Sequence, residues 1–552
     1  MTSYKDCPFS LSGAIAALHH YEGILNRLYG EEQDRSNKLA TLTSAVDVNM
    51  SAPPYEQVEG KLLVKQALLG LNSEIVDSIA DTFYKIVAND DRVFIFHLLR
   101  NDDDDDDGYS IGFAVGEYYG SVLKWEYDNT EVTENVIANI RVLKCNLSTS
   151  LNVYTPYDVV NYKTDNVQNV VITCNLATGT ENNAVTGVGD DSEDGIINNS
   201  LVVIKLATDN DKFSFDETTV TSKRIGLTTH TNRENTICKT ALIHPNDALD
   251  LDKDYQLLFI AADSDAGLCG CVVDMTKFDE RVDPQSLTDD IDPTVTLTPE
   301  IEIKPNANEG QTLFSNTFSD IACSPLIKSA TKADTTYCII IAIGTDYEKN
   351  FRKAYCVLAI TKTNSGLKYE STGWRVINIT NVPDALNNMF NWSKAVYDKR
   401  YSEFVVTYGT SSTPKTDSDV NYKFDSVVSI NMKPTFDEST MTVSFTFGFT
   451  VLSDKSISVN DTCYDEYREA VIMCMNRAVY SRLGSSWTTD NTEIKFEKES
   501  IMLRTVASDD NGKVYALGKA YAAGNCEIVY ILNYDIFNEW RRGIDTQRVS
   551  LN

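Results

Sequence analysis

The sequence predicts an all-β fold in which a unit of four antiparallel strands is repeated seven times. Three observations predict it. The segments YDKRYSEFVVTYG (397–409) and YDEYREAVIMCMN (464–476) both place Tyr-Asp and a Glu before a run of β-formers. The same junction between a polar turn and an apolar run occurs at five other places. An aromatic residue beside an acid then follows most of the units.

The apolar run is the first element of the repeat. Each run begins with an Asp or Asn and continues with β-branched or other apolar residues, without strict alternation. A short continuous apolar run is expected of a strand that is covered on both faces. The seven runs are marked by Val93, Val170, Leu257, Ile339, Phe404, Val471 and Val514.

Another strand and an aromatic-acid turn complete most units. We interpret the aromatic residue as packing between neighbouring units, and an exposed aromatic ring for sugars is the alternative. The residues concerned are Phe215, Phe278, Tyr369, Phe436 and Phe537.

Four antiparallel strands repeated around a centre form a β-propeller. We therefore expect seven four-stranded blades over residues 60–552. A tandem of β-sandwich domains is the alternative, but it gives no reason for the turn chemistry to repeat. Within a propeller, Tyr397, Asp398, Tyr464 and Asp465 are expected to be structural turn residues and not recognition residues.

Residues 1–59 differ in pattern and predict a helix followed by a polar linker. Apolar side chains recur there at steps of three and four, which is typical of an amphipathic helix. This helix is expected to dock on the propeller or on another protein. Its apolar face consists of Leu11, Ile15, Leu18, Tyr21, Leu25 and Leu28. The segment 60–86 fits either a helix or a strand that closes the ring.

The charge of the chain limits its partners. Lys and Arg total 49 against 80 Asp and Glu, for a net charge of −31. Such a surface repels phosphate backbones and anionic lipid, so neither nucleic acid nor a membrane is expected as a partner. No secretory signal or apolar span is evident, and the cysteines lie mostly inside apolar runs as reduced, buried residues. We therefore expect a cytoplasmic location.

No familiar catalytic motif is present. The sequence lacks HExxH, GxSxG, GxGxxG and the P-loop pattern, so no catalytic, cofactor-binding or metal-binding residues are predicted. Six consecutive Asp residues at 102–107 form an acidic loop, interpreted as solvated, with calcium or a basic partner as the alternative. Long polar loops at 179–200 and 279–300 are further places where binding is expected.

One motif resembles a known family. Ser508, Asp510, Gly512 and Tyr515 resemble the Asp box of sialidase-type propellers, which braces a turn in that family. Simple hairpin chemistry at Asp-Asn-Gly is the alternative. The resemblance implies a glycoside hydrolase with three arginines around one carboxylate.

The divergent, loop-rich and acidic repeats resemble propeller-bearing structural proteins of tailed bacteriophage particles. This resemblance implies a non-enzymatic assembly protein in a tail or nozzle, with other virion proteins as partners in a symmetric ring. It also implies a location in the virion after assembly in the host cytoplasm. A receptor- or glycan-binding propeller is the first alternative, and a sialidase-like enzyme the second.

Overall fold

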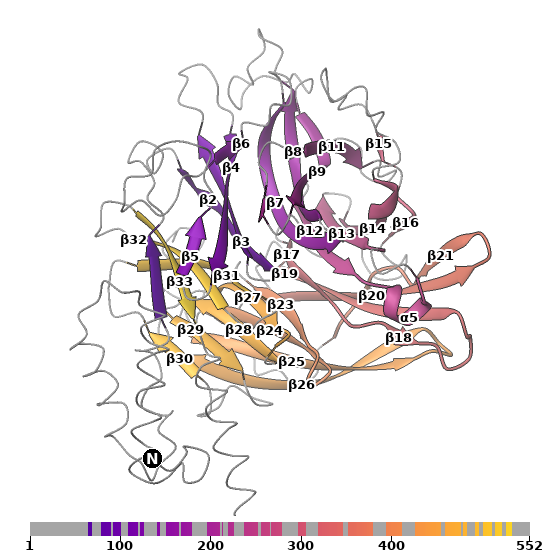
Figure 1. Cartoon of the computed structure of the whole chain (residues 1–552). Helices are drawn as coiled ribbons and strands as arrows, with labels where there is room; N and C mark the ends of the chain where they lie inside the picture. Colours follow the sequence, from indigo (N-terminus) through magenta and orange to yellow (C-terminus); the bar gives the residue numbers. More distant parts are fainter. Residues whose placement is uncertain are drawn as a thin grey trace, which may run out of the picture.

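The computed structural model describes strands and short helical turns between Val64 and Leu532 (Figure 1). The described residues are those elements, bounded below, and the connecting residues 244–245, 250–251, 255–256, 278, 299–300, 304, 324–326, 329–334, 364–365, 372–374, 377–378, 393, 399–402, 438–441, 466–467, 469 and 509. The predicted N-terminal helix, with Leu11, Ile15, Leu18, Tyr21, Leu25 and Leu28, lies outside the described residues.

Five antiparallel sheets of four to six strands share no backbone ladder with one another. The first, in spatial order, contains β1 (Val64–Leu68), β33 (Cys526–Leu532), β32 (Val514–Ala520) and β31 (Ile501–Ser508). The second contains β12 (Ile237–Ile243), β13 (Leu257–Ser264), β14 (Gly267–Asp274) and β16 (Ile301–Ile303). The third contains β17 (Phe318–Cys323), β19 (Thr335–Thr345), β20 (Phe351–Thr363) and β21 (Gly366–Ser371), with the short β18 (Ile327–Lys328) and β22 (Arg375–Val376) at its sides.

The other two separate sheets follow in the sequence. The fourth contains β23 (Lys394–Asp398), β24 (Glu403–Thr410), β25 (Ser426–Asp437) and β26 (Thr442–Ser453). The fifth contains β27 (Val459–Asp465), β28 (Ala470–Met475), β29 (Ala478–Arg482) and β30 (Thr492–Lys495). Two single turns, α5 (Asn246–Leu249) and η3 (Met275–Lys277), flank the second sheet.

A sixth sheet has eleven strands. Its main path contains β2 (Ile79–Asn89), β3 (Arg92–Arg100), β4 (Tyr109–Tyr119), β7 (Leu151–Thr164), β8 (Val167–Thr178), β9 (Ile196–Asp209), β11 (Thr219–Ile225) and β15 (Thr296–Leu297). The short strands β5 (Val122–Trp125), β6 (Arg141–Leu143) and β10 (Lys212–Phe213) pair at its sides.

The sheets form a propeller because the first strand of each meander contacts the first strand of the next. β2, β7, β12, β17, β23, β27 and β31 make a closed circuit of neighbours in which β31 contacts β2 again. We call these the inner strands. The predicted all-β propeller is therefore confirmed by the topology.

The predicted number of seven separate blades is wrong. Five blades stand as separate sheets, while the meanders that begin with β2 and β7 belong to the single eleven-stranded sheet. The physical reason is strand length, since β4 and β7 are long enough to meet at the pair Tyr109–Val153 and so join the two meanders.

The two ends of the described chain meet in one sheet. β1 pairs antiparallel with β33 over the register from Val64–Leu532 to Leu68–Ile528. The segment for which helix and closing strand were both considered is therefore a strand here. This pairing ties residues near the start of the chain to its C-terminal sheet, and so closes the propeller by backbone hydrogen bonds.

The core consists of apolar layers between adjacent sheets. Along β19, Ile339 and Ile341 pack toward the sheet that contains Phe404, whereas Ile340 packs toward the sheet that contains Phe259. Successive side chains of a strand point to opposite faces, so a strand covered on both faces must be apolar throughout. This explains the continuous apolar runs of the repeat. The cysteines Cys174, Cys338, Cys356 and Cys474 are buried thiols, and none of them forms a disulfide with another described cysteine.

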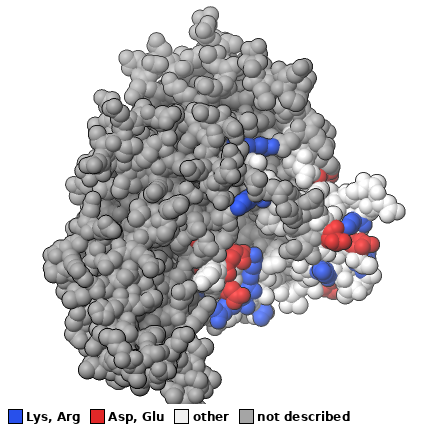
Figure 2. All heavy atoms as spheres, in the orientation of Figure 1, with Lys and Arg blue, Asp and Glu red and all other residues white. Residues whose placement is uncertain are grey.

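The described surface carries both signs of charge close together (Figure 2). Within the part of the chain that the structure describes, no helix is long and apolar enough to span a bilayer.

Candidate functional site: a polar ring on the inner strands

Each inner strand places one polar side chain at an equivalent position, which we call the axial ring. Equivalence is defined by hydrogen bonding. The side-chain oxygen of an Asp or Thr ring member accepts from a backbone N–H on the next inner strand, and the residue just before that N–H is the next ring member. Four such bonds are present. The ring members are Lys85 (β2), Asp158 (β7), Lys239 (β12), Asp320 (β17), Lys394 (β23), Asp461 (β27) and Thr505 (β31).

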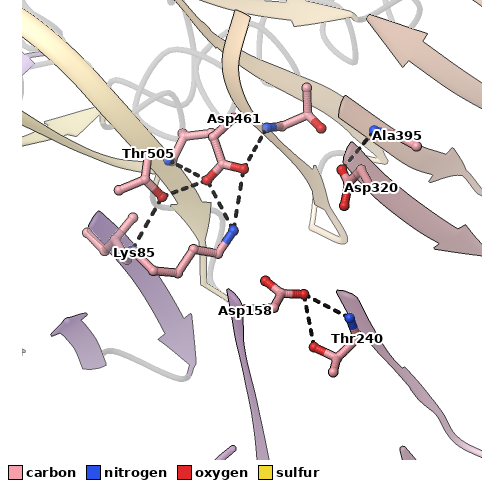
Figure 3. A network of polar contacts seen from close by, with 10 residues as sticks. Lys85, Asp158, Thr240, Asp320, Ala395, Asp461 and Thr505 are labelled. Carbon is pink, nitrogen blue, oxygen red and sulfur yellow. Dashed lines mark hydrogen bonds and ion pairs between the residues drawn. The ribbon is translucent and has the colours of Figure 1, made fainter. Parts of the chain in front are cut away.

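Two of the carboxylates each bridge one pair of neighbouring inner strands (Figure 3). Asp158 Oδ2 accepts from both the N–H and the Oγ1–H of Thr240, each at 2.9 Å. Asp320 Oδ2 accepts from the N–H of Ala395 at 3.0 Å. A charge-assisted bond of this kind between separate sheets fixes their relative position as well as stabilising them.

The third carboxylate holds three inner strands together where the circuit closes (Figure 3). Asp461 Oδ2 accepts from Thr505 Oγ1 at 2.6 Å, from the N–H of Val506 at 3.2 Å and from Lys85 Nζ at 3.2 Å. Thr505 Oγ1 in turn accepts from the N–H of Ile86 at 3.3 Å. Asp461 and Thr505 therefore connect β27, β31 and β2.

The charges alternate around the ring. Lysines stand on β2, β12 and β23, and aspartates stand between them on β7, β17 and β27. An odd-membered ring cannot alternate completely, and two adjacent like charges would each disfavour the other's ionisation. The remaining position is the neutral Thr505, which both donates and accepts a hydrogen bond. The ring thus carries three positive and three negative groups without adjacent like charges.

The charged ring members also shift one another's pKa values. Burial disfavours the charged form of Lys85, but the carboxylates of Asp461, Asp158 and Asp320 outweigh it and raise its pKa. Burial raises the pKa of Asp461 less than Lys85, Lys394 and its hydrogen bonds lower it, so the net shift is downward. Asp320 contributes to this shift although its strand, β17, is not a neighbour of β2 in the circuit of inner strands.

Burial has the larger effect at two other ring members. It lowers the pKa of Lys239 in spite of the nearby Asp158 and Asp320. It also raises the pKa of Asp320 in spite of Lys394 and Lys239.

Part of the ring is open to solvent. Lys85, Asp158, Lys239, Asp320 and Lys394 are half-buried, and Asp461 and Thr505 are buried. The ammonium of Lys394 makes no hydrogen bond to another described residue. A cation that is held near two carboxylates but has unused donors is available to an incoming polar group.

Thr505→Val tests whether the neutral ring member joins the strands. The substitution keeps the size of the side chain but removes a donor to Asp461 and an acceptor for the N–H of Ile86. We expect the free energy of unfolding to fall by about 1–3 kcal/mol, because buried polar groups lose their partner. Urea denaturation measures it. The matched control is Thr435→Val on the exposed side of β25, for which no change is expected; equal effects would contradict the interpretation.

The two repeated Tyr-Asp phrases form the same turn after an inner strand. Asp398 accepts from the N–H groups of Arg400 and Tyr401 at 3.0 and 3.3 Å, and Asp465 accepts from the N–H of Tyr467 at 3.2 Å. In each turn the residue four positions after the Asp has a positive φ, 54° at Ser402 and 52° at Glu469.

The tyrosines of these phrases contact neighbouring side chains. The ring of Tyr397 lies 4.8 Å from that of Phe404, centroid to centroid, and Lys399 Nζ lies 5.9 Å from the ring centroid of Tyr464.

The aromatic residues of the repeat have different environments. Phe278 is fully buried beside η3, whereas Tyr369 and Phe436 are partly buried against the apolar layers. The ring of Phe436 lies 5.0 Å from that of Tyr337 in the neighbouring sheet. Phe215 and Phe537 lie outside the described residues, as do the six-Asp loop and the long loops at 179–200 and 279–300, apart from residues Ile196–Ser200 in β9 and 296–297 and 299–300.

The Asp-box positions are placed only in part. Asp510 and Gly512 fall outside the described residues, while Tyr515 donates from its hydroxyl to Asp509 Oδ2 at 2.9 Å. Among the described residues, no group of three or more His, Cys, Asp or Glu side chains is arranged to hold a metal ion.

Among the known proteins compared with this chain, only solved structures show a similarity to it. No protein-family model and no curated protein matches the chain. A *Trypanosoma rangeli* sialidase with 2,3-difluorosialic acid is 11% identical, with a TM-score of 0.36, over 88% of this chain and 61% of the sialidase. The extracellular domain of a hybrid two-component system from *B. thetaiotaomicron* is 12% identical, with a TM-score of 0.32, over 85% of this chain and 40% of that one. The chain thus spans less than two thirds of each.

Proposed function

We propose that the chain is a non-enzymatic binding propeller that holds a sugar residue of a glycan at the axial ring. The observation that supports this proposal is the alternation of lysines and aspartates, all but Asp461 half-buried, around one axis. Ligand sites are commonly marked by a few polar groups that converge within an otherwise apolar fold.

The chemistry of the ring suits a polyhydroxyl ligand. A sugar hydroxyl can donate to a carboxylate and accept from an ammonium at the same time. Asp320 and Lys394 are consecutive, half-buried members of the ring and offer an acceptor beside a donor. Because the charges of the ring balance, the ligand needs no net charge. We place the sugar against this sector.

Binding is proposed instead of hydrolysis because the carboxylates have structural partners. Asp158 and Asp461 each accept more than one hydrogen bond from neighbouring strands. A general acid or base must exchange protons with substrate near the working pH. The lowered pKa of Asp461 makes it a poor proton donor at neutral pH.

The expected role in a phage particle receives no support from the comparisons. The solved structures named above are a sialidase and an extracellular domain of a two-component system, and the ligand of the sialidase is a property of that protein. At these TM-scores the likeness carries no argument about a ligand. A virion location, and a cytoplasmic one, stay predictions.

Lys394→Met tests the proposal. A glycan array identifies a ligand for the wild-type chain, and calorimetry with that glycan compares the variants. We expect Lys394→Met to weaken binding at least about tenfold, because a lost hydrogen bond to a charged group is typically worth 1.5–3 kcal/mol and about 1.4 kcal/mol corresponds to tenfold.

The control for this experiment is Lys328→Met, at an exposed position on β18, which should bind as the wild type does. Circular dichroism shows whether both variants are folded. Unchanged affinity in folded Lys394→Met, or an array without any bound glycan, would contradict the proposal.

A further inference from the structure

The outermost strand of one blade, β26 (Thr442–Ser453), is unusually long for its place. It has 12 residues, whereas the outer strands β16, β21 and β30 have 3, 6 and 4. Within the described residues it pairs with β25 alone, in an unbroken register from Val428–Val451 to Asp437–Thr442. Figure 1 shows β26 at the lower rim of the described strands.

The sequence of β26 lacks the charged residues and prolines that commonly protect an edge strand. TVSFTFGFTVLS contains no charged residue and no proline. Natural sheets usually protect an exposed edge with lysines, prolines, bulges or a short strand. A long edge with high β-propensity and no charge is a template for pairing with another strand.

One face of β26 is held firmly by the neighbouring blade. Val443 is buried, and Phe445, Phe447 and Phe449 pack partly against the apolar layer shared with β19 and β20. The rings of Phe445 and Tyr355 lie 5.6 Å apart at an interplanar angle of 69°. The other face carries the exposed Ser444 and Thr446. The strand is thus rigidly presented and does not need to be ordered on binding.

We propose that β26 pairs antiparallel with β26 of a second copy of this chain, which forms a two-fold dimer. In such an interface the same strand of both copies is paired, so charges of one sign on the strand would be brought close to the same charges of the second copy. A chain with a net charge of −31 repels its own copies over most of its surface. The uncharged edge is the place where a second copy approaches without that cost.

This inference does not depend on the sugar site. The axial ring lies on the inner strands, whereas β26 is the fourth strand from the axis in its sheet. Either of the two proposals can therefore be wrong without affecting the other.

Sedimentation velocity of the full chain tests the proposal over a range of concentrations. We expect the wild type to dimerise and Thr446→Lys to remain monomeric, because the two added lysines, one from each copy, would lie close together beside the two-fold axis. Ser365→Lys adds the same charge in the exposed β20–β21 turn and should leave the dimer intact. Far-UV circular dichroism confirms that both variants are folded.

Hydrogen exchange supplies a second readout at the strand itself. The backbone amides of residues 444–450 should gain protection as the concentration of wild-type protein rises, and those of Thr446→Lys should not. A wild type that is monomeric at all concentrations, a dimeric Thr446→Lys, or a dimer without protection at β26 would each overturn the proposal.

Discussion

Arg482→Met is expected to cost about 3–5 kcal/mol of unfolding free energy at neutral pH, because it removes one partner of a buried ion cluster. Arg482, on β29, and Asp398, at the end of β23, are both 0% exposed. Arg482 Nη1 donates to Asp398 Oδ2 at 2.9 Å, and Nη2 donates to Glu403. The guanidinium therefore joins two neighbouring blades, and its loss leaves two carboxylates without their counter-ion.

The pH dependence of this variant follows from Asp398. Burial raises the pKa of Asp398, and Arg482 opposes that shift. Without Arg482 the pKa in the folded state rises further above its unfolded value. A group with a raised folded pKa loses its stabilising contribution as pH rises through that pKa. The loss of unfolding free energy caused by Arg482→Met should therefore be larger at pH 8 than at pH 5.

Urea denaturation at both pH values measures this effect. Lys368→Met is the matched control, since Lys368 and Glu370 form an ion pair at 2.7 Å that is mostly exposed. Exposed pairs contribute little, so no measurable change is expected there. Equal stability of Arg482→Met and the control, or an identical deficit at both pH values, would show that the cluster does not join the blades.

Asp461→Ala is the second substitution with a large expected effect. It removes the acceptor shared by Thr505, Val506 and Lys85, where the circuit of inner strands closes. We expect a loss of about 3–5 kcal/mol at pH 7, since Lys85 would remain without its ion-pair partner. The loss should appear as a lower urea midpoint.

The sign of the pH effect is opposite to that at Asp398. The pKa of Asp461 in the folded state lies below its usual value of 3.8. Its contribution is complete above that value and disappears as pH falls through the folded pKa. The difference between wild type and Asp461→Ala should therefore narrow in acid. Asp334→Asn, at an exposed turn, is the control and should match the wild type throughout. A difference that widens in acid would contradict this role.

The repeat could be predicted from the sequence because its signal is local. A polar turn before a continuous apolar run reflects a strand covered on both faces, and all seven marker residues fall on the second strand of a meander. The single eleven-stranded sheet could not be predicted, since it depends on one pairing between Tyr109 and Val153 that no local pattern records.

The axial ring was missed because its members are single charged residues in separate strands. Each looks ordinary in its own segment, as in YKIV around Lys85 or SKAV around Lys394. A signal is nevertheless present. Several members stand four residues before the turn residue, as Lys394 does before Asp398 and Asp461 before Asp465. Aligning the inner strands on their turns would have brought the alternating charges together.

An experimental structure of the chain with its array-identified glycan tests the central claim most directly. The account predicts a sugar residue at the axis, with its hydroxyls within hydrogen-bonding distance of Lys394 Nζ and the carboxylate of Asp320. A glycan bound on another surface, without contact to the axial ring, would contradict the claim.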